Sequence, residues 1–343
     1  MNFEKLIRPE LLDIKPYSSA RDEFEGAAEV FLDANENPFE NGINRYPDPL
    51  QRNLKNRIAG IKGISADHIL LGNGSDECID LLIRLFCVPG KDKMLSLSPS
   101  YGMYAVSAKI NNVGFNTYLL DENFDFQSEE LLEAAKDTKI IWLCSPNNPN
   151  GALLKKEKIQ EVLEKFQGIV VLDEAYIDFS GEESWIKKLD QFQNLVVLQT
   201  FSKAYGMAGL RLGMLFTHPK LVTWLNKIKP PYNISSLTQE HALVQLENLS
   251  VYQQQLLELN EQKSQLQSRL VELPMVEKVF PSDANFLLIR VKNADEMYHY
   301  LIENGVVVRN RSTQPRCENC LRITIGTPEE NERVIELFNL KMF

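Results

Sequence analysis

The chain has 343 residues, enough for about two domains, and its 44 % of hydrophobic residues is typical of a globular protein. Its formal net charge of −10 argues against a nucleic-acid partner, because phosphate backbones repel acidic surfaces. No apolar stretch approaches the roughly 20 residues of a membrane helix, so we expect no membrane partner.

The five cysteines have no disulfide-framework spacing and suit a reducing compartment, so we expect a cytoplasmic protein. The opening segment MNFEKLIRPELLDIKPY has no apolar core of a secretory signal, and we expect the mature chain to begin near Met1. Cys317 and Cys320 form a single C-x-x-C pair, which without a second pair argues against zinc and leaves a redox role open; we interpret the two as ordinary thiols. No metal site is predicted.

In chain order, the first element of interest is a helix that begins after the apolar run ILLGNG. Ser75, Asp76 and Glu77 fall in its first turn. The free N–H groups of such a turn, next to glycines that allow close approach, can bind a phosphate. In the simpler interpretation, Ser75 is only the N-cap and the two acids favour the helix dipole. The segment alone leaves both interpretations open.

The middle of the chain alternates strands with helices. Four nearly continuous apolar runs of strand length occupy residues 94–98, 140–144, 169–173 and 195–199. Such runs are typical of strands buried on both faces of a parallel sheet. Between them, residues 155–166 repeat apolar positions at helical spacing. The pattern predicts an α/β fold with a mostly parallel sheet.

The last third of the chain has a different sequence pattern. Residues 239–273 contain no Gly or Pro and predict long helices, whereas NFLLIRV, VVVRN and CLRITIG predict strands of a smaller α+β domain with helices at 294–303 and 329–338. We therefore expect an N-terminal arm (1–30) that packs on the small domain or on a partner subunit, a large domain (31–245) and a small domain (246–343).

Polar residues follow several of the predicted strands, where ligands of parallel sheets bind. SPNNPNG follows residues 140–144, Asp173 ends its strand, and TFSKAYGMAGLR follows residues 195–199. A lysine in such apolar surroundings, here Lys203, can have a depressed pKa and form a Schiff base with a carbonyl, although a solvated surface lysine is the simpler interpretation. Asp173 could cap a loop or hold a cationic ring nitrogen.

The motifs GNGSDE, PSYGMY, SPNNPNG, DEAYIDF and TFSKAYGMAGLRLG, in this order, resemble those of the fold-type I aminotransferases that use pyridoxal 5'-phosphate. LDANENP, NRYPDP and CLRITIG resemble the histidinol-phosphate branch of that family. The resemblance implies a homodimer with shared active sites. It also implies amino-group exchange between histidinol phosphate and 2-oxoglutarate, a step of histidine synthesis. Asn150 departs from the family, which has Thr there, but Asn suits a turn.

The resemblance implies roles around the cofactor ring for five residues. Lys203 is the Schiff-base lysine, and Asp173 is the partner of the protonated pyridine nitrogen. Asn148 and Tyr176 would bind the ring's phenolic oxygen, and Tyr101 would stack on the ring face. A carboxylate at the ring nitrogen keeps the ring protonated, so that it can absorb negative charge from the substrate. Lys203, Asp173 and Tyr176 are the implied catalytic residues.

The resemblance also implies two anion sites. The cofactor phosphate would be held by Ser75, Asp76, Thr200, Ser202 and Arg211, with Tyr46 reaching it from the other subunit. The anionic end of the substrate would be bound by Arg322, with Tyr17, Asn35 and Arg309 beside it. A locally basic site of this kind is what an anionic ligand requires in an acidic protein.

Three alternatives remain open at this point. The aromatic aminotransferases and threonine-phosphate decarboxylase share the same motifs, and only the latter releases carbon dioxide. A pyridoxal-phosphate-sensing regulator would need a DNA-binding segment, but the stretch before LDANENP holds no basic helix-turn-helix.

Overall fold

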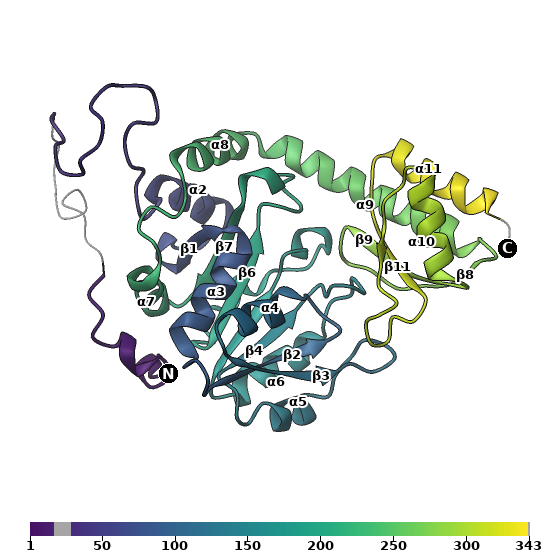
Figure 1. Cartoon of the computed structure of the whole chain (residues 1–343), viewed down its shortest axis with the longest axis horizontal. Coiled ribbons are helices and arrows are strands. Elements are labelled where there is room, and N and C mark those ends of the chain that lie inside the picture. The colour runs from purple at the N-terminus through teal and green to yellow at the C-terminus, as the bar shows by residue number, and fades with distance from the viewer. Residues whose placement is uncertain (17–28, 342–343) are drawn as a thin grey trace.

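The computed structural model describes residues 1–16 and 29–341, which form two β-sheets covered by helices (Figure 1). The larger sheet has seven strands in the order β1-β7-β6-β5-β4-β2-β3. They are β1 (Ile69–Asn73), β2 (Lys93–Ser98), β3 (Gly114–Leu119), β4 (Ile140–Cys144), β5 (Ile169–Asp173), β6 (Leu195–Thr200) and β7 (Leu212–Thr217). The four strands predicted between residues 94 and 199 are confirmed as β2, β4, β5 and β6.

The larger sheet is mostly parallel, as predicted. The pairs β2·β3, β2·β4, β4·β5 and β5·β6 are parallel, and only β7 runs antiparallel to its neighbours β1 and β6. The carboxyl ends of β1, β2, β4, β5 and β6 therefore lie at the same edge of the sheet. This edge is the place where a parallel sheet binds its ligand.

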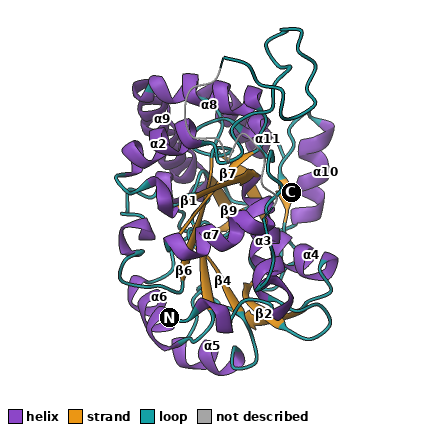
Figure 2. Ribbon diagram, turned by 90° about the vertical axis from the view of Figure 1, so that its left-hand side faces the viewer, coloured by secondary structure: helices purple, strands orange, loops and turns teal. Residues whose placement is uncertain are grey.

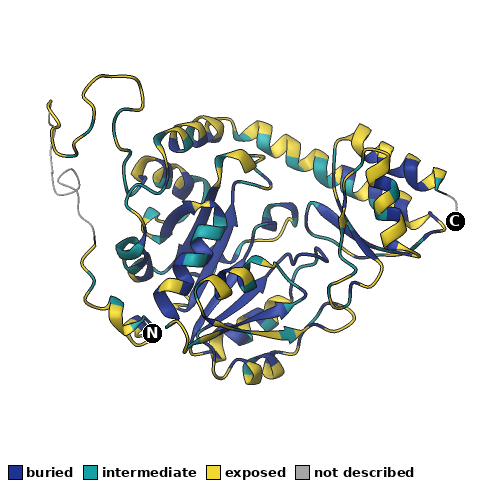
Figure 3. Ribbon diagram, in the orientation of Figure 1, coloured by how far each residue is buried: buried dark blue, intermediate teal, exposed yellow. Residues whose placement is uncertain are grey.

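Helices cover both faces of the larger sheet (Figure 2). Successive residues of β4 point to opposite sides: Ile141 and Leu143 belong to one buried cluster, Ile140 and Trp142 to the other. The first cluster packs against α2 (Arg52–Lys62), α5 (Ser128–Ala134), α6 (Lys156–Lys165) and α8 (Ser236–Glu247), the second against α3 (Gly74–Phe86), α4 (Met103–Ile110) and α7 (Pro219–Ile228). The sheet thus lies buried between two helical layers (Figure 3).

The smaller sheet has four antiparallel strands in the order β10-β11-β9-β8. These are β8 (Val276–Val279), β9 (Phe286–Val291), β10 (Arg309–Asn310) and β11 (Cys320–Thr324). One face, with Leu287 and Ile289, packs against the C-terminal part of α9 (Leu249–Val271), α10 (Ala294–Glu303) and α11 (Pro328–Leu340). Leu288 on the other face joins the core of the larger sheet. The second sheet therefore faces the carboxyl edge of the first (Figure 1).

Several local expectations can be compared with the structure. The long helical stretch is interrupted at Asn248 between α8 and α9, and the predicted strand VVVRN is a strand only at its last two residues. The interpretation of Ser75 as N-cap is wrong, because α3 begins at Gly74 and Asn73 is the cap residue. The division into an arm and two domains stays a prediction.

Six 3₁₀ helices complete the described chain: η1 (Phe3–Lys5), η2 (Pro9–Leu11), η3 (Ala66–His68), η4 (Ile177–Phe179), η5 (Trp185–Lys188) and η6 (Ala208–Leu210). None of the helices in the described ranges is long and apolar enough to cross a membrane.

Candidate active site

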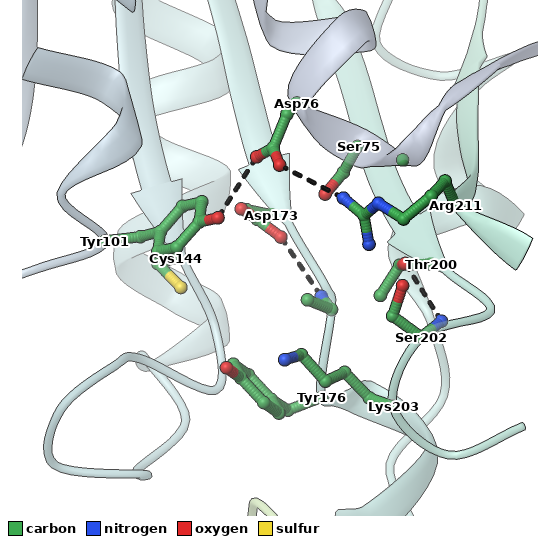
Figure 4. A pocket seen from close by; sticks show the side chains of 12 residues that line it. Ser75, Asp76, Tyr101, Cys144, Asp173, Tyr176, Thr200, Ser202, Lys203 and Arg211 are labelled. Atoms are coloured by element: carbon green, nitrogen blue, oxygen red, sulfur yellow. Dashed lines mark hydrogen bonds and ion pairs between the residues drawn. The ribbon is translucent and has the colours of Figure 1, made fainter. Parts of the chain in front are cut away.

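A cavity lies at the carboxyl edge of the larger sheet (Figure 4). Strand ends and the loops after them supply its walls, so segments far apart in the sequence converge as expected. Nine residues selected from the sequence line it, namely Ser75, Asp76, Tyr101, Asp173, Tyr176, Thr200, Ser202, Lys203 and Arg211. Gly74, Cys144 and Ala175 complete the lining.

One end of the cavity is suited to an anion. The first turn of α3 lines this end, and the first N–H groups of a helix have no acceptor within the helix. Gly74 adopts a left-handed φ of 72° that few other residues tolerate. The Gly74 N–H donates to the Arg211 carbonyl oxygen (2.6 Å), which fixes the start of the helix beside Arg211. The hydroxyl groups of Thr200 and Ser202 lie on the facing loop, where the Ser202 N–H donates to Thr200 Oγ1 (3.1 Å). These donors form a site suited to an anion such as a phosphate.

Gly213 of β7 explains how the strand and the helix approach so closely. A Cβ atom at this position would lie 2.2 Å from the backbone nitrogen of Ser75 and 2.2 Å from the carbonyl carbon of Gly74. No side chain fits there unless the first turn of α3 moves. The glycine that ends the motif TFSKAYGMAGLRLG therefore serves the geometry of the anion site.

Asp173, at the end of β5, is a fixed and buried carboxylate with 2 % exposure. The Tyr104 hydroxyl donates to its Oδ2 (2.6 Å), and the Ala175 N–H donates to its Oδ1 (3.1 Å). Burial raises the pKa of Asp173, while these two hydrogen bonds and the nearby charge of Lys203 act in the opposite direction. A carboxylate held in this way is suited to pair with a cationic nitrogen.

Tyr104 was not singled out from the sequence. Its ring is fully buried on α4 and stacks on Trp142 with 4.9 Å between ring centroids. The available signal was its position three residues after Tyr101 in the motif PSYGMY. That signal does not show that the hydroxyl reaches β5.

Lys203 projects into the cavity from the loop after β6 (Figure 4). Burial lowers the pKa of its amine, and the positive charge of Arg322 lowers it further. Its Nζ lies 5.7 Å from the centre of the Tyr176 ring. A lysine with a lowered pKa is neutral for a larger fraction of the time, which makes it a nucleophile toward a carbonyl group.

Each of the two tyrosines that line the cavity contacts a residue of another element. The Tyr101 hydroxyl donates to Asp76 Oδ1 (3.0 Å), which joins the segment before α4 to α3. Tyr176 packs edge-on against Phe286 of β9, with centroids 5.1 Å apart. Tyr176 therefore lines the cavity and at the same time contacts the smaller sheet.

Arg322 of β11 comes from the smaller sheet and contacts the loop after β4. Its Nη1 donates to Asn148 Oδ1 (2.7 Å), and its guanidinium lies 5.1 Å from the centre of the Phe286 ring. Arg309 of β10 is its partner in the antiparallel ladder. The structure thus brings Arg322, Asn148 and Arg309 together next to the cavity.

Two other predicted residues do not line this cavity. Asn35 and Tyr46 line a separate groove, where the Tyr46 ring stacks on Tyr232 at 4.4 Å. Tyr17 lies outside the described residues. The expected role of Tyr46 in the site of another subunit stays a prediction.

The residues present fit pyridoxal phosphate. Lys203 offers an amine for its aldehyde, Asp173 a buried carboxylate for its ring nitrogen, and the first turn of α3 a binding site for its phosphate. Four polar residues of the cavity lie together at the phosphate end, namely Ser75, Thr200, Ser202 and Arg211.

Known proteins of similar sequence and structure lead to the same chemistry. A histidinol-phosphate aminotransferase of Christiangramia forsetii is 53 % identical, over 98 % of this chain and 97 % of that protein. One from Parabacteroides distasonis is 53 % identical over 99 % of each chain. The crystal structure of a histidinol-phosphate aminotransferase from Clostridium acetobutylicum matches with a TM-score of 0.80 at 26 % identity, over 86 % of this chain and 90 % of the other.

The sequence profile of the family described as aminotransferase class I and II matches residues 18–338, most of the chain. The chain therefore belongs to the class I and II aminotransferases and is a pyridoxal-phosphate-dependent enzyme.

Proposed function

We propose that this aminotransferase exchanges an amino group between histidinol phosphate and 2-oxoglutarate, giving imidazole-acetol phosphate and glutamate in histidine synthesis. The observation that carries the proposal is the position of Arg322. It reaches from the smaller sheet to Asn148 beside the cavity, and Arg309 pairs with it in the ladder. The names of the relatives, which are 53 % identical over nearly the whole chain, support the same substrate.

Pyridoxal phosphate, when bound, supplies an electron-withdrawing ring conjugated to the substrate nitrogen. The residues of this chain do the rest. Asp173 holds a proton at the ring nitrogen, and Tyr104 keeps that carboxylate in place. The Nζ of Lys203 accepts the proton from the substrate carbon that bears the amino group, for which a lowered pKa suits it.

Arg322 and Arg309 bind the anionic end of either substrate. Histidinol phosphate ends in a phosphate and 2-oxoglutarate in a carboxylate, so a guanidinium group can receive both in turn. Asn148 accepts a hydrogen bond from Arg322 and thereby orients its guanidinium. The phosphate rather than the imidazole is then the part of the substrate that is recognised by charge.

The test is a panel of amino donors with 2-oxoglutarate, in which glutamate and carbon dioxide are assayed separately. Histidinol phosphate should be the best donor, well above histidinol, and should release no carbon dioxide. Preference for phenylalanine or tyrosine would indicate an aromatic aminotransferase. Carbon dioxide from threonine phosphate would indicate a decarboxylase.

Arg322→Ala should weaken the use of histidinol phosphate far more than cofactor binding, because a hydrogen bond to a charged group is worth on the order of 1.5 to 3 kcal/mol. We expect kcat/KM for histidinol phosphate to fall by about tenfold or more. The cofactor content, measured from the absorbance of the purified enzyme, should stay near that of the wild type. Equal losses of cofactor and activity would contradict a role in substrate binding.

We further propose a homodimer in the cytoplasm. The segment around Tyr46 exposes large apolar side chains, with Leu32 at 86 %, Phe39 at 80 % and Ile43 at 57 % exposure. Apolar side chains gathered on one exposed segment are typical of a protein interface.

The cytoplasm suits the five cysteines, all of which are free thiols.

A further inference from the structure

Arg311 is a third arginine close to Arg322 and Arg309. It directly follows β10, and its N–H donates to the Cys320 carbonyl oxygen (2.8 Å), which continues the pairing with β11. Side chains two residues apart on an extended strand point to the same face, so Arg309 and Arg311 share the face of their ladder partner Arg322. This is the face of the smaller sheet that contacts Asn148.

The three guanidinium groups influence one another electrostatically. Burial and the nearby charges of Arg322 and Arg309 lower the pKa of Arg311 to about 10. Burial also lowers the pKa of Arg322, with a further contribution from Arg309. Burial raises the pKa of the Tyr176 phenol, which lines the cavity, and the positive charges of Arg322 and Arg311 act in the opposite direction. Arg311 shares the sheet face of Arg322, whose Nη1 reaches Asn148 beside the cavity.

No carboxylate compensates these charges in the described part of the chain. Neither Arg309, Arg311 nor Arg322 forms an ion pair with an Asp or Glu among residues 1–16 and 29–341. By contrast, Arg316 in the same loop pairs with Glu122. Three cations that gather without an acidic partner among the described residues, in a protein of net charge −10, indicate a site for an anionic ligand.

Buried polar atoms without a partner are concentrated in the same place. Among the described residues these include Nε of Arg311, Oγ of Ser312 and Nε of Arg322. A buried donor that is left unpaired destabilises the folded protein, so such atoms are normally satisfied. A phosphate offers acceptors for several donors at once, whereas a single carboxylate offers fewer.

We propose that Arg311 is a specificity-determining residue that binds the phosphate group of the amino substrate together with Arg309 and Arg322. The inference rests on the proposed function and extends it by one residue. Phosphate monoesters carry a charge of about −1.5 to −2 at neutral pH, which a single guanidinium does not balance. The third arginine gives the site its preference for a phosphate end over a neutral hydroxyl end.

The experiment compares Arg311→Gln and Arg311→Lys with the wild-type holoenzyme. Arg333→Gln is the matched control, because Arg333 is an exposed arginine of α11 that pairs with Glu336. For each enzyme, kcat/KM is measured with histidinol phosphate and with histidinol. Binding of inorganic phosphate to the holoenzyme is measured by calorimetry, and folding by the melting temperature.

In Arg311→Gln we expect kcat/KM for histidinol phosphate to fall by about 10- to 100-fold, with a change of at most about threefold for histidinol. Inorganic phosphate should bind more weakly by a similar factor. Arg311→Lys should recover part of both losses, and Arg333→Gln should behave as the wild type. The melting temperature of Arg311→Gln should not fall, because one of three mutually repelling charges is removed.

Equal losses with both substrates, or no loss with either, would overturn the role of Arg311. If wild-type enzyme uses histidinol phosphate no better than histidinol, the proposed function fails. The role of Arg311 is then decided by inorganic phosphate alone: weaker binding in Arg311→Gln but not in Arg333→Gln supports it. Unchanged or undetectable phosphate binding overturns it.

Discussion

At the scale of single residues, the site combines a lysine and a carboxylate whose pKa values both respond to burial. Burial lowers the pKa of Lys203 and raises the pKa of Asp173, so in each case it favours the neutral form. For Lys203 this produces a nucleophile. For Asp173 the hydrogen bonds from Tyr104 and Ala175 counteract burial and favour the anion that a ring nitrogen requires.

Lys203→Ala should fold but hold no covalently bound cofactor, because Lys203 is the only lysine that lines the cavity among the described residues. Borohydride reduction of the wild type followed by peptide mapping should label Lys203 alone. The melting temperature of the apo forms serves as the folding control. A label on any other lysine would refute the assignment of the site.

Asp173→Asn should keep the cofactor and lose most of its activity, because a neutral amide no longer favours a protonated ring nitrogen. The loss should appear in kcat, since the substrate arginines are untouched. Turnover near the wild-type value would show that the charge of Asp173 is unimportant here.

Tyr104→Phe removes only the hydroxyl group and keeps the ring that stacks on Trp142. Because a donor to the charged form is lost, the pKa of Asp173 should rise, and the acidic limb of the rate profile should move to higher pH. We expect kcat to fall by about tenfold at neutral pH, the effect of one hydrogen bond to a charged group.

Tyr118→Phe is the control for this variant, because the Tyr118 hydroxyl donates to Glu130 (2.6 Å) away from the cavity. Its pH profile should match the wild type. If the Tyr104→Phe profile does not move either, Tyr104 has only a packing role.

At the scale of elements, the phosphate end depends on the contact between β7 and the first turn of α3. Gly213→Ala should displace that turn, because the added methyl group would overlap the backbone of Gly74 and Ser75. We expect the apparent Kd for pyridoxal phosphate, measured by titration of the apoenzyme, to rise by about tenfold or more, as when one charged hydrogen bond is lost.

Gly209→Ala is the matched control, since a Cβ atom at Gly209 would meet nothing within 4 Å. Both variants should be compared for melting temperature as well as for cofactor binding. Normal cofactor affinity in Gly213→Ala would mean that the helix turn can move without harm to the phosphate site.

At the scale of the whole molecule, the smaller sheet completes the site through Arg322, and we propose that a second subunit completes it through Tyr46. In a heterodimer of Lys203→Ala and Tyr46→Ala subunits, one site has both defects and the other has neither. After random exchange of equal amounts, heterodimers form half the population, so roughly a quarter of full activity should appear.

Each variant alone must first be shown to be well below that activity, and exchange is followed with differently tagged subunits. If the activity of confirmed heterodimers does not exceed the average activity of the two parent variants, Tyr46 does not act across the interface. The stacking of Tyr46 on Tyr232 would then be a structural contact within one subunit.

The sequence alone was sufficient where local pattern determines structure. Continuous apolar runs located β4, β5 and β6 to within a residue, because strands buried on both faces must be apolar throughout. The residues that end these strands include Asp173, and parallel strands bring their carboxyl ends to one edge. The pattern by itself selected Ser75, Asp76, Asp173 and Lys203, and the resemblance to the family supplied the other five selected residues that line the cavity.

Tertiary structure alone decided the contacts between elements that no spacing in the sequence encodes. The hydroxyl of Tyr104 reaches Asp173 only because α4 packs across the end of β5. Arg311 joins Arg309 and Arg322 only because the chain after β10 stays paired with β11. Periodicity determines which side of an element is buried, but the partner on that side is set by how the sheets and helices pack.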